Sequence, residues 1–146
     1  MSVKWDKRFL KLAKHVSEWS KDPSTKVGCV LVNDDKQVIS MGYNGFPRGV
    51  EDSEERLNDR STKYLMVQHA EANALTQVII VERGLTAYVT HKPCANCTGL
   101  LLQSGVKRIV TTVPDSGIAE RFKDSFATTD TMLLEAGVKI EYYWDI

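Results

Sequence analysis

Four side chains of this sequence have the types and spacing of a metal-dependent catalytic site. His69 and Glu71 belong to a His-Ala-Glu run, and Cys94 and Cys97 belong to Pro-Cys-Ala-Asn-Cys. Two cysteines three residues apart lie on one helical face, so both thiolates can reach one zinc ion at about 2.3 Å, and a neutral imidazole can add a third bond at about 2.0 Å. Three protein ligands leave tetrahedral zinc one open position, which is typical of a catalytic site.

Glu71 lies two residues after His69, so the two side chains cannot share one helical face as zinc ligands. We therefore assign Glu71 to proton transfer. Zinc lowers the pKa of a bound water from about 15.7 to about 7, and a neighbouring carboxylate can take that proton and return it to a leaving group. Together the four residues predict attack on an amidine-like carbon with loss of ammonia.

Hydrophobic periodicity predicts the elements that position these residues. Helices are expected over 5–20, 69–77, 94–104 and 120–136, and strands over 27–32, 37–41, 85–90, 106–112 and 138–143. The first two strands are joined by turn residues and predict an antiparallel hairpin buried on both faces, while helices between the last three strands imply parallel pairing. Residues 42–63 show no period and are expected to form a functional loop. The expected fold is α/β, a mixed five-stranded sheet with helices on both faces.

The composition narrows the class of protein. The 146 residues suit one domain over 1–146, and 19 Lys and Arg balance 19 Asp and Glu, which argues against non-specific duplex binding. No apolar run approaches the roughly 20 residues of a membrane span, and the N-terminal residues are charged where a signal peptide is apolar. Three cysteines do not make a secreted disulfide framework. We expect a cytoplasmic protein without a membrane partner.

Several motifs together resemble one enzyme family. His-x-Glu followed by Pro-Cys-x-x-Cys is the signature of zinc nucleobase deaminases. The runs Ser-Lys-Asp-Pro-Ser-Thr-Lys-Val-Gly, Gly-Tyr-Asn-Gly-Phe-Pro, His-Ala-Glu-Ala-Asn-Ala and Tyr-Val-Thr are similar to those of the zinc-dependent deoxycytidylate (dCMP) deaminase family, over roughly residues 5–110. The chain departs from the family at 111–115, where Thr-Thr-Val-Pro-Asp replaces a segment that often carries a tyrosine.

The resemblance implies a three-layer α/β/α cytidine-deaminase-like fold and hydrolysis of dCMP to dUMP and ammonia, which supplies dTMP synthesis. It implies one catalytic Zn²⁺ held by His69, Cys94 and Cys97, with Glu71 as acid and base. It further implies that Asn44 meets the deoxyribose hydroxyl and that the backbone N–H of Ala70 holds the pyrimidine carbonyl. A homo-hexamer, a dCTP activator with Mg²⁺, and a dTTP inhibitor bound near the loop after Gly42 are also family properties that it implies.

The residues beside the first strand support a nucleotide ligand. Ser24, Thr25 and Lys26 offer two hydroxyls and a cation at the start of that strand, where they could fix a single phosphate. These three residues are therefore candidate substrate-binding residues.

Other functions use the same residues. Deamination of dCTP, of a C5-modified dCMP or of a tRNA base would need the same metal centre, although the zero net charge counts against tRNA. A structural zinc module that binds a partner is the non-enzyme alternative, but a closed site needs a fourth ligand and has no use for Glu71. His91 is not expected to ligate, because it would fill the open position, and Cys29 is expected to be a buried inert thiol.

Overall fold

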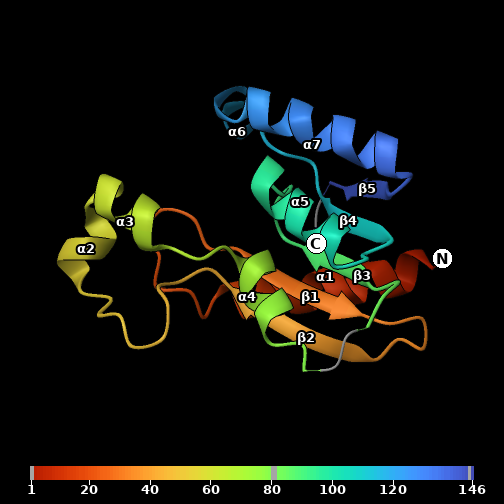
Figure 1. The fold of residues 1–146 in the computed structure, drawn as a ribbon, viewed down its shortest axis with the longest axis horizontal. Helices are drawn as coiled ribbons and strands as arrows, with labels where there is room; N and C mark the ends of the chain where they lie inside the picture. The colour runs from red at the N-terminus through yellow and green to blue at the C-terminus, as the bar shows by residue number, and fades with distance from the viewer. Residues whose placement is uncertain (1, 80–81, 145) are drawn as a thin grey trace.

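The computed structural model describes residues 2–79, 82–144 and 146 (Figure 1). The helices are α1 (Val3–Ser17), α2 (Glu54–Asn58), α3 (Arg60–Met66), α4 (Ala70–Thr76), α5 (Ala95–Gln103), α6 (Ser116–Arg121) and α7 (Lys123–Ala136). The strands are β1 (Gly28–Val32), β2 (Val38–Tyr43), β3 (Thr86–Val89), β4 (Arg108–Thr112) and β5 (Lys139–Tyr143). Within the described part, no helix is both long enough and apolar enough to cross a membrane.

The five strands form one mixed sheet in the order β2-β1-β3-β4-β5. Strand β1 is antiparallel to both β2 and β3, and β3, β4 and β5 run parallel. Helix α5 connects β3 to β4, and α6 and α7 connect β4 to β5. The predicted hairpin followed by parallel strands is therefore confirmed.

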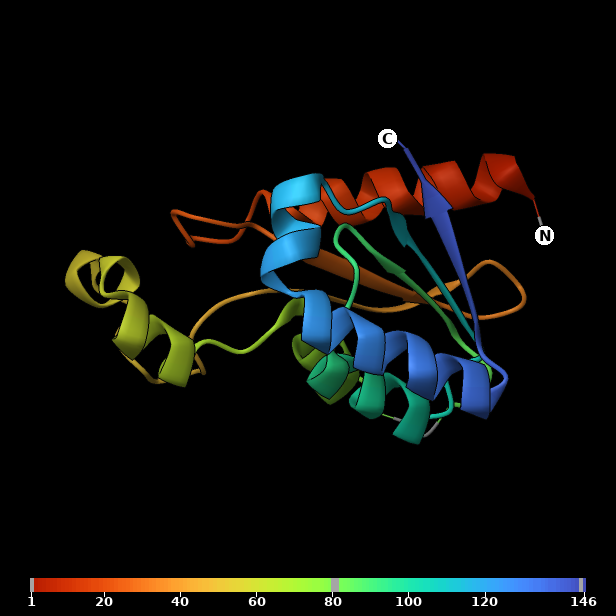
Figure 2. The ribbon, with the colours of Figure 1, turned by 90° about the horizontal axis from the view of Figure 1, so that it is seen from above.

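Side chains of β1 alternate between two cores, one on each face of the sheet. Cys29 and Leu31 pack with residues of α4 and α5, whereas Val30 and Val32 pack against α1. Figure 2 shows α1 on one face of the sheet and α4, α5 and α7 on the other. The arrangement is the α/β/α sandwich that the sequence led us to expect, and it leaves the helix starts at one end of the sheet free to form a site.

The expectation that both strands of the hairpin are buried on both faces is wrong for β2. This strand lies at the edge of the sheet. Ser40 and Gly42 are buried under α4, while Met41 and Tyr43 are 40% and 41% exposed. Because side chains alternate along a strand, one covering helix buries only every second residue.

Two other expectations need correction. The segment over 42–63, expected to be a loop, contains α2 and most of α3. No residue of these helices is buried, so the sequence shows no hydrophobic period there. The single helix expected over 120–136 is two helices that meet at Phe122, and the first begins after Asp115, whose Oδ1 accepts a hydrogen bond from the Ile118 N–H at 2.9 Å. The segment 78–81, ambiguous between helix and strand in the sequence, lies partly outside the described residues.

A glycine lets α4 approach β2 closely. A Cβ at Gly42 would lie 2.4 Å from the Ala74 nitrogen and 2.5 Å from the Ala70 oxygen. The hydroxyl of Ser40 donates a hydrogen bond to the Ala74 carbonyl at 2.6 Å, so the same strand also ties the end of the helix. Strand β2 therefore fixes the position of α4 and of the residues at its start.

Candidate active site

The three predicted metal ligands lie together at the starts of two neighbouring helices. His69 is the N-cap of α4 and Cys94 is the N-cap of α5, with Cys97 in the first turn of α5. The ligand atoms of all three lie within 4.8 Å of one another. The Nδ1 atom of His69 is 3.2 Å from the Cys97 sulfur and 3.6 Å from the Cys94 sulfur. One imidazole and two thiols thus converge on one point.

This donor set fits a zinc ion. A hydrogen bond from Cys97, opposed by burial and aided by His69, lowers the pKa of the Cys94 thiol to about 4. The same contact with Cys94, together with burial, raises the pKa of Cys97 above its ordinary value. Two adjacent thiolates repel each other unless a cation lies between them, and zinc binds thiolates. Among the described residues the cluster has three members, which leaves tetrahedral zinc an open position.

Glu71 is a buried carboxyl in the first turn of α4. It is 4% exposed and lines a cavity beside the metal ligands. Burial raises the pKa of Glu71 to about 7, an effect partly offset by a backbone hydrogen bond and by His69. A carboxyl that is neither exposed nor part of the ligand cluster is suited to exchange protons with a molecule in the cavity.

Helix α7 holds the start of α5 in place. The backbone N–H of Ala95 donates to the Ser125 hydroxyl at 2.8 Å. The Thr129 hydroxyl donates to the Pro93 carbonyl at 3.1 Å and lies 3.0 Å from the Thr98 hydroxyl. These contacts satisfy polar groups around the turn that carries both cysteines, so the sulfur positions are fixed by buried packing.

One cavity of about 810 Å³ joins the metal cluster to the polar loop before β1. The residues that line it include most of the predicted site: Ser24, Thr25, Asn44, His69, Ala70, Glu71 and Cys94. His69 makes no side-chain cap on α4, and the first two residues of this helix, Ala70 and Glu71, line the cavity. Lys26 is exposed and is not among the lining residues, so its contact with a phosphate stays a prediction without support from the geometry.

Asn44 connects the polar loop to the end of β2. Its Oδ1 accepts a hydrogen bond from the Val27 N–H at 2.9 Å, and its Nδ2 donates to the Thr25 carbonyl at 2.9 Å. Asn44 is 7% exposed but lines the cavity. The sequence did not indicate this structural role, and the predicted contact with deoxyribose remains a prediction.

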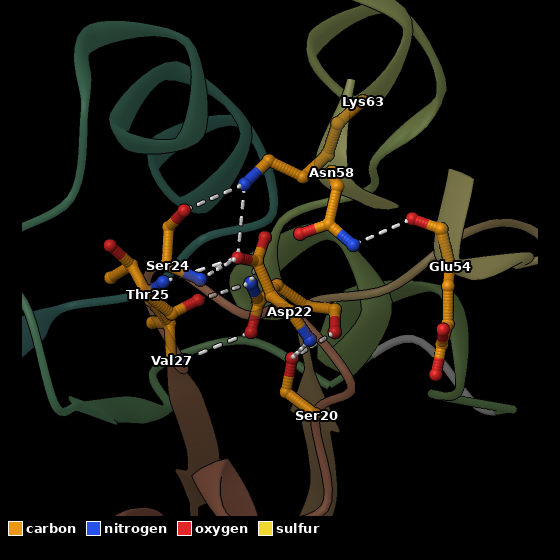
Figure 3. A network of polar contacts seen from close by, with 9 residues as sticks. Ser20, Asp22, Ser24, Thr25, Val27, Glu54, Asn58 and Lys63 are labelled. Carbon is orange, nitrogen blue, oxygen red and sulfur yellow. Dashed lines mark hydrogen bonds and ion pairs between the residues drawn. The ribbon is translucent and has the colours of Figure 1, made fainter. Parts of the chain in front are cut away.

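Lys63 is a site residue that the sequence analysis missed. Figure 3 shows its ammonium group between Ser24 and Asp22, to which it donates at 3.3 Å and 3.1 Å. Its side chain is 13% exposed and lines the cavity. No periodic pattern surrounds Lys63 in the sequence, and it meets residues about forty positions earlier, so only the fold brings the contact to light.

The remaining predictions concern His91, Cys29 and the segment that departs from the family. His91 lines the cavity with its Nδ1 2.9 Å from the Thr90 hydroxyl, and it is not a member of the described ligand cluster. Cys29 is fully buried, and burial raises the pKa of its thiol well above the ordinary value, so it is an inert core residue. Residues 112–115 line the cavity, so the predicted departure from the family at 111–115 would lie in the cavity wall.

Comparisons with known proteins agree with this geometry. The family model described as "Cytidine and deoxycytidylate deaminase zinc-binding region" matches residues 3–113. An uncharacterized deaminase from the luxG 3' region of Aliivibrio fischeri is 36% identical over 142 residues, which cover 97% of this chain and 95% of that protein. Mouse deoxycytidylate deaminase is 33% identical over 138 residues, covering 90% of this chain and 74% of that protein.

One solved structure has the same fold over nearly the full length of both chains. The crystal structure of dCMP deaminase from cyanophage S-TIM5, in complex with dCMP and dUMP, superimposes with a TM-score of 0.76. Its sequence is 26% identical, and the match covers 98% of this chain and 99% of that one. The cytidine-deaminase-like fold thus extends over nearly the whole chain.

Proposed function

This chain belongs to the cytidine and deoxycytidylate deaminase zinc-binding family, and we propose that it is a hydrolase that converts dCMP into dUMP and ammonia. The observation that carries the proposal is one cavity whose wall includes His69 and Cys94 of the ligand cluster, the buried carboxyl of Glu71, and the polar loop before β1. The proposal also treats residues 1–146 as one deaminase domain.

Zinc held by His69, Cys94 and Cys97 supplies Lewis-acid activation of water. Glu71 moves the protons of the hydrolysis. As the water oxygen bonds to C4 of the cytosine, Glu71 takes one proton and delivers it to N3. It then carries the second proton of that water to the exocyclic N4, the C4–N4 bond breaks, and ammonia leaves with a carbonyl at C4. Both protons of the water are thus accounted for in dUMP and ammonia.

Other residues of the cavity orient the nucleotide. The N–H of Ala70, in the uncapped first turn of α4, would donate to the pyrimidine carbonyl, and Asn44 would meet the deoxyribose hydroxyl. Ser24 and Thr25 line the cavity and offer hydroxyls to the phosphate, with Lys26 as the lysine that the sequence predicts for it. Hydrogen-bond donors at one end of the cavity and a proton carrier at the other would hold C4 at the metal cluster.

Regulation and assembly belong to the proposal as well. A second cavity of about 180 Å³ is lined by Trp19, Tyr43 and Phe46 at the loop after Gly42. Its place supports a dCTP or dTTP effector there, with Mg²⁺ accompanying dCTP, and we include a homo-oligomer of hexameric type. Nucleic acid and membrane partners are not part of the proposal.

The test is ammonia release by the zinc-loaded protein from a panel of substrates: dCMP, deoxycytidine, dCTP, 5-methyl-dCMP and tRNA. We expect dCMP to give the highest kcat/KM. A higher value for dCTP or 5-methyl-dCMP would change the substrate while keeping the reaction. If zinc is bound and no member of the panel is turned over, a structural zinc module is favoured. Two features argue instead for an open catalytic site: the ligand cluster has three members among the described residues, and Glu71 is buried.

A further inference from the structure

We propose that Lys63 determines specificity for the 5′-phosphate of the substrate and that Asp22 is the positioning residue that holds it. The inference rests on the proposed deamination of dCMP and names the group that distinguishes the nucleotide from the nucleoside. It assigns this role to a lysine of α3, in place of the Lys26 that the sequence predicts.

Lys63 is an unusual member of the arm formed by α2 and α3, residues 54–66. None of the residues of these two helices is buried, and Figure 1 shows them extending away from the sheet. The side chain of Lys63 nevertheless is only 13% exposed, because it turns toward the body and reaches Asp22 and Ser24. The arm thus delivers one cation into the wall of the cavity that holds Glu71.

Among the described residues, the hydrogen bonds of Lys63 and Ser24 leave two donors for an anion. An ammonium group has three N–H donors, and Lys63 directs two of them to Asp22 and Ser24, at 3.1 Å and 3.3 Å. The Ser24 oxygen accepts from Lys63, so its own O–H proton is available to another acceptor. The third N–H of the lysine and the serine hydroxyl come from separate segments and meet on the cavity wall. Adjacent donors of this kind suit phosphate oxygens.

Asp22 lies beside this position, but its charge is already compensated. Its Oδ1 accepts the N–H groups of Ser24 and Thr25 at 2.8 Å and 3.1 Å, in addition to Lys63. Burial opposes ionisation, yet these hydrogen bonds outweigh it and hold the pKa of Asp22 below its ordinary value. A carboxylate that accepts three fixed hydrogen bonds on one oxygen repels an incoming phosphate less than a free one, and it holds the long lysine side chain in one orientation.

The other cations of the cavity lack these features. Lys92 is 2.8 Å from a carboxylate on α7 and stacks over two aromatic rings, so it is engaged in packing. Arg60 and Arg121 are exposed and lie over the rings of neighbouring aromatic residues. Lys63 alone of these four has a serine hydroxyl beside its ammonium group within the described contacts. It is therefore the cation best placed to bind a phosphate.

The experiment compares ligands that differ only by the phosphate. Lys63→Met zinc enzyme is assayed for kcat/KM with dCMP and with deoxycytidine, and calorimetry gives Kd for the unreactive pair dUMP and deoxyuridine. We expect kcat/KM for dCMP to fall by about 10- to 100-fold, mainly through KM, and dUMP binding to weaken by a similar factor. Values for deoxycytidine and deoxyuridine should change by less than about threefold. Lys63→Arg, which keeps the charge, should recover part of the loss.

A matched control removes a charge from the same helix. Arg60 lies three residues before Lys63 on α3 and, among the described residues, contacts neither Ser24 nor Asp22. Arg60→Met should therefore change the dUMP to deoxyuridine ratio by less than about threefold. If Arg60→Met and Lys63→Met reduce the ratio equally, the effect is general electrostatics and the inference is overturned. It is also overturned if Lys63→Met weakens nucleotide and nucleoside alike, or if Lys26→Met shows the phosphate-selective loss instead.

Asp22 is tested through its dependence on Lys63. Asp22→Asn should raise KM for dCMP more than for deoxycytidine, and the Asp22→Asn/Lys63→Met double variant should discriminate phosphate no worse than Lys63→Met alone. Additive losses would refute the positioning role. Wild-type protein that binds dUMP through Lys63 but does not deaminate dCMP would refute the proposed function and leave this assignment standing.

Discussion

A buried charged network ties α1 to the parallel half of the sheet, and its disruption gives a quantitative test of the structure. Asp6 on α1 is 2% exposed and Arg108 on β4 is 4% exposed. Arg108 donates to both carboxylate oxygens of Asp6, and the hydroxyls of Tyr88 and Tyr143 donate to them at 3.0 Å and 2.8 Å. Arg108 also forms two hydrogen bonds with Glu141, at 2.9 Å and 3.0 Å.

The perturbation is Asp6→Asn, which keeps the volume of the side chain and removes its charge. The NH₂ group of the new amide would face the N–H and O–H donors of Arg108 and Tyr143, which the carboxylate now accepts. Arg108 would also lose one of the two carboxylates that balance its charge. Removal of one member of a buried ion pair costs about 3–5 kcal/mol of the free energy of unfolding. For a chain of this size that corresponds to a drop in Tm of roughly 6–20 °C.

The effect should depend on pH in a defined direction. Burial opposes ionisation of Asp6, but hydrogen bonds from Arg108, Tyr143 and Tyr88 outweigh it and lower its pKa below the ordinary value. A carboxyl whose folded pKa lies below its unfolded value of about 3.9 stabilises the fold above that pH and loses the contribution as pH falls through the folded pKa. The difference between wild type and Asp6→Asn should therefore be constant near neutral pH and shrink below about pH 4.

The assay is thermal and denaturant unfolding of both proteins between pH 3 and 8, with Lys107→Met as the control. Lys107 pairs with Asp34 at the surface, where solvent screens the charges, so its loss should leave Tm nearly unchanged. A loss below about 1 kcal/mol in Asp6→Asn, or a difference that stays the same down to pH 3, would show that the network does not stabilise the fold as argued.

Three further predictions concern the catalytic half of the molecule. Glu71→Gln should lower kcat for dCMP by about 10²–10⁴-fold while zinc content by atomic emission stays at the wild-type value; a near-normal kcat would remove Glu71 from proton transfer. Chelation of zinc should abolish ammonia release and lower Tm, and added zinc should restore both; full activity in metal-free protein would exclude a catalytic zinc. Gly42→Ala should lower both Tm and activity, because its Cβ would lie 2.4 Å from the α4 backbone, whereas Gly99→Ala, with open space, should be neutral or slightly stabilising; equal Tm values would refute the close approach.

The sequence predicts local features well where a residue's neighbours in the chain determine them. His69, Cys94 and Cys97 each belong to a short motif at a helix start, and the structure brings their ligand atoms together. The strands and the helices that cover the sheet could be predicted because apolar residues recur with the period of each element, and these residues mark its buried face. Those features could be predicted because their evidence is contiguous in the chain.

Features that depend on distant parts of the chain could not be predicted. The half-exposed character of β2 depends on which helix covers it, and the strand itself contains apolar residues on both faces. The contact of Lys63 with Asp22 joins residues from either side of the first hairpin. Lys26 follows Ser24 and Thr25 directly in the predicted motif, yet it is not among the residues that line the cavity. Proximity in sequence was an unreliable guide to a pocket assembled from several segments.

Helices α2 and α3 contain no buried residues, so substitutions in them are constrained less by folding than substitutions around the metal cluster. Glu71 and Cys97 are buried in the sandwich, so mutations around them affect the stability of the fold as well as catalysis. The arm over 54–66 contributes little to the interior, so most substitutions there should change the stability of the fold only slightly. Substitutions in this arm can therefore alter the part of the cavity wall that carries Lys63 without disturbing the buried positions of Glu71 and Cys97.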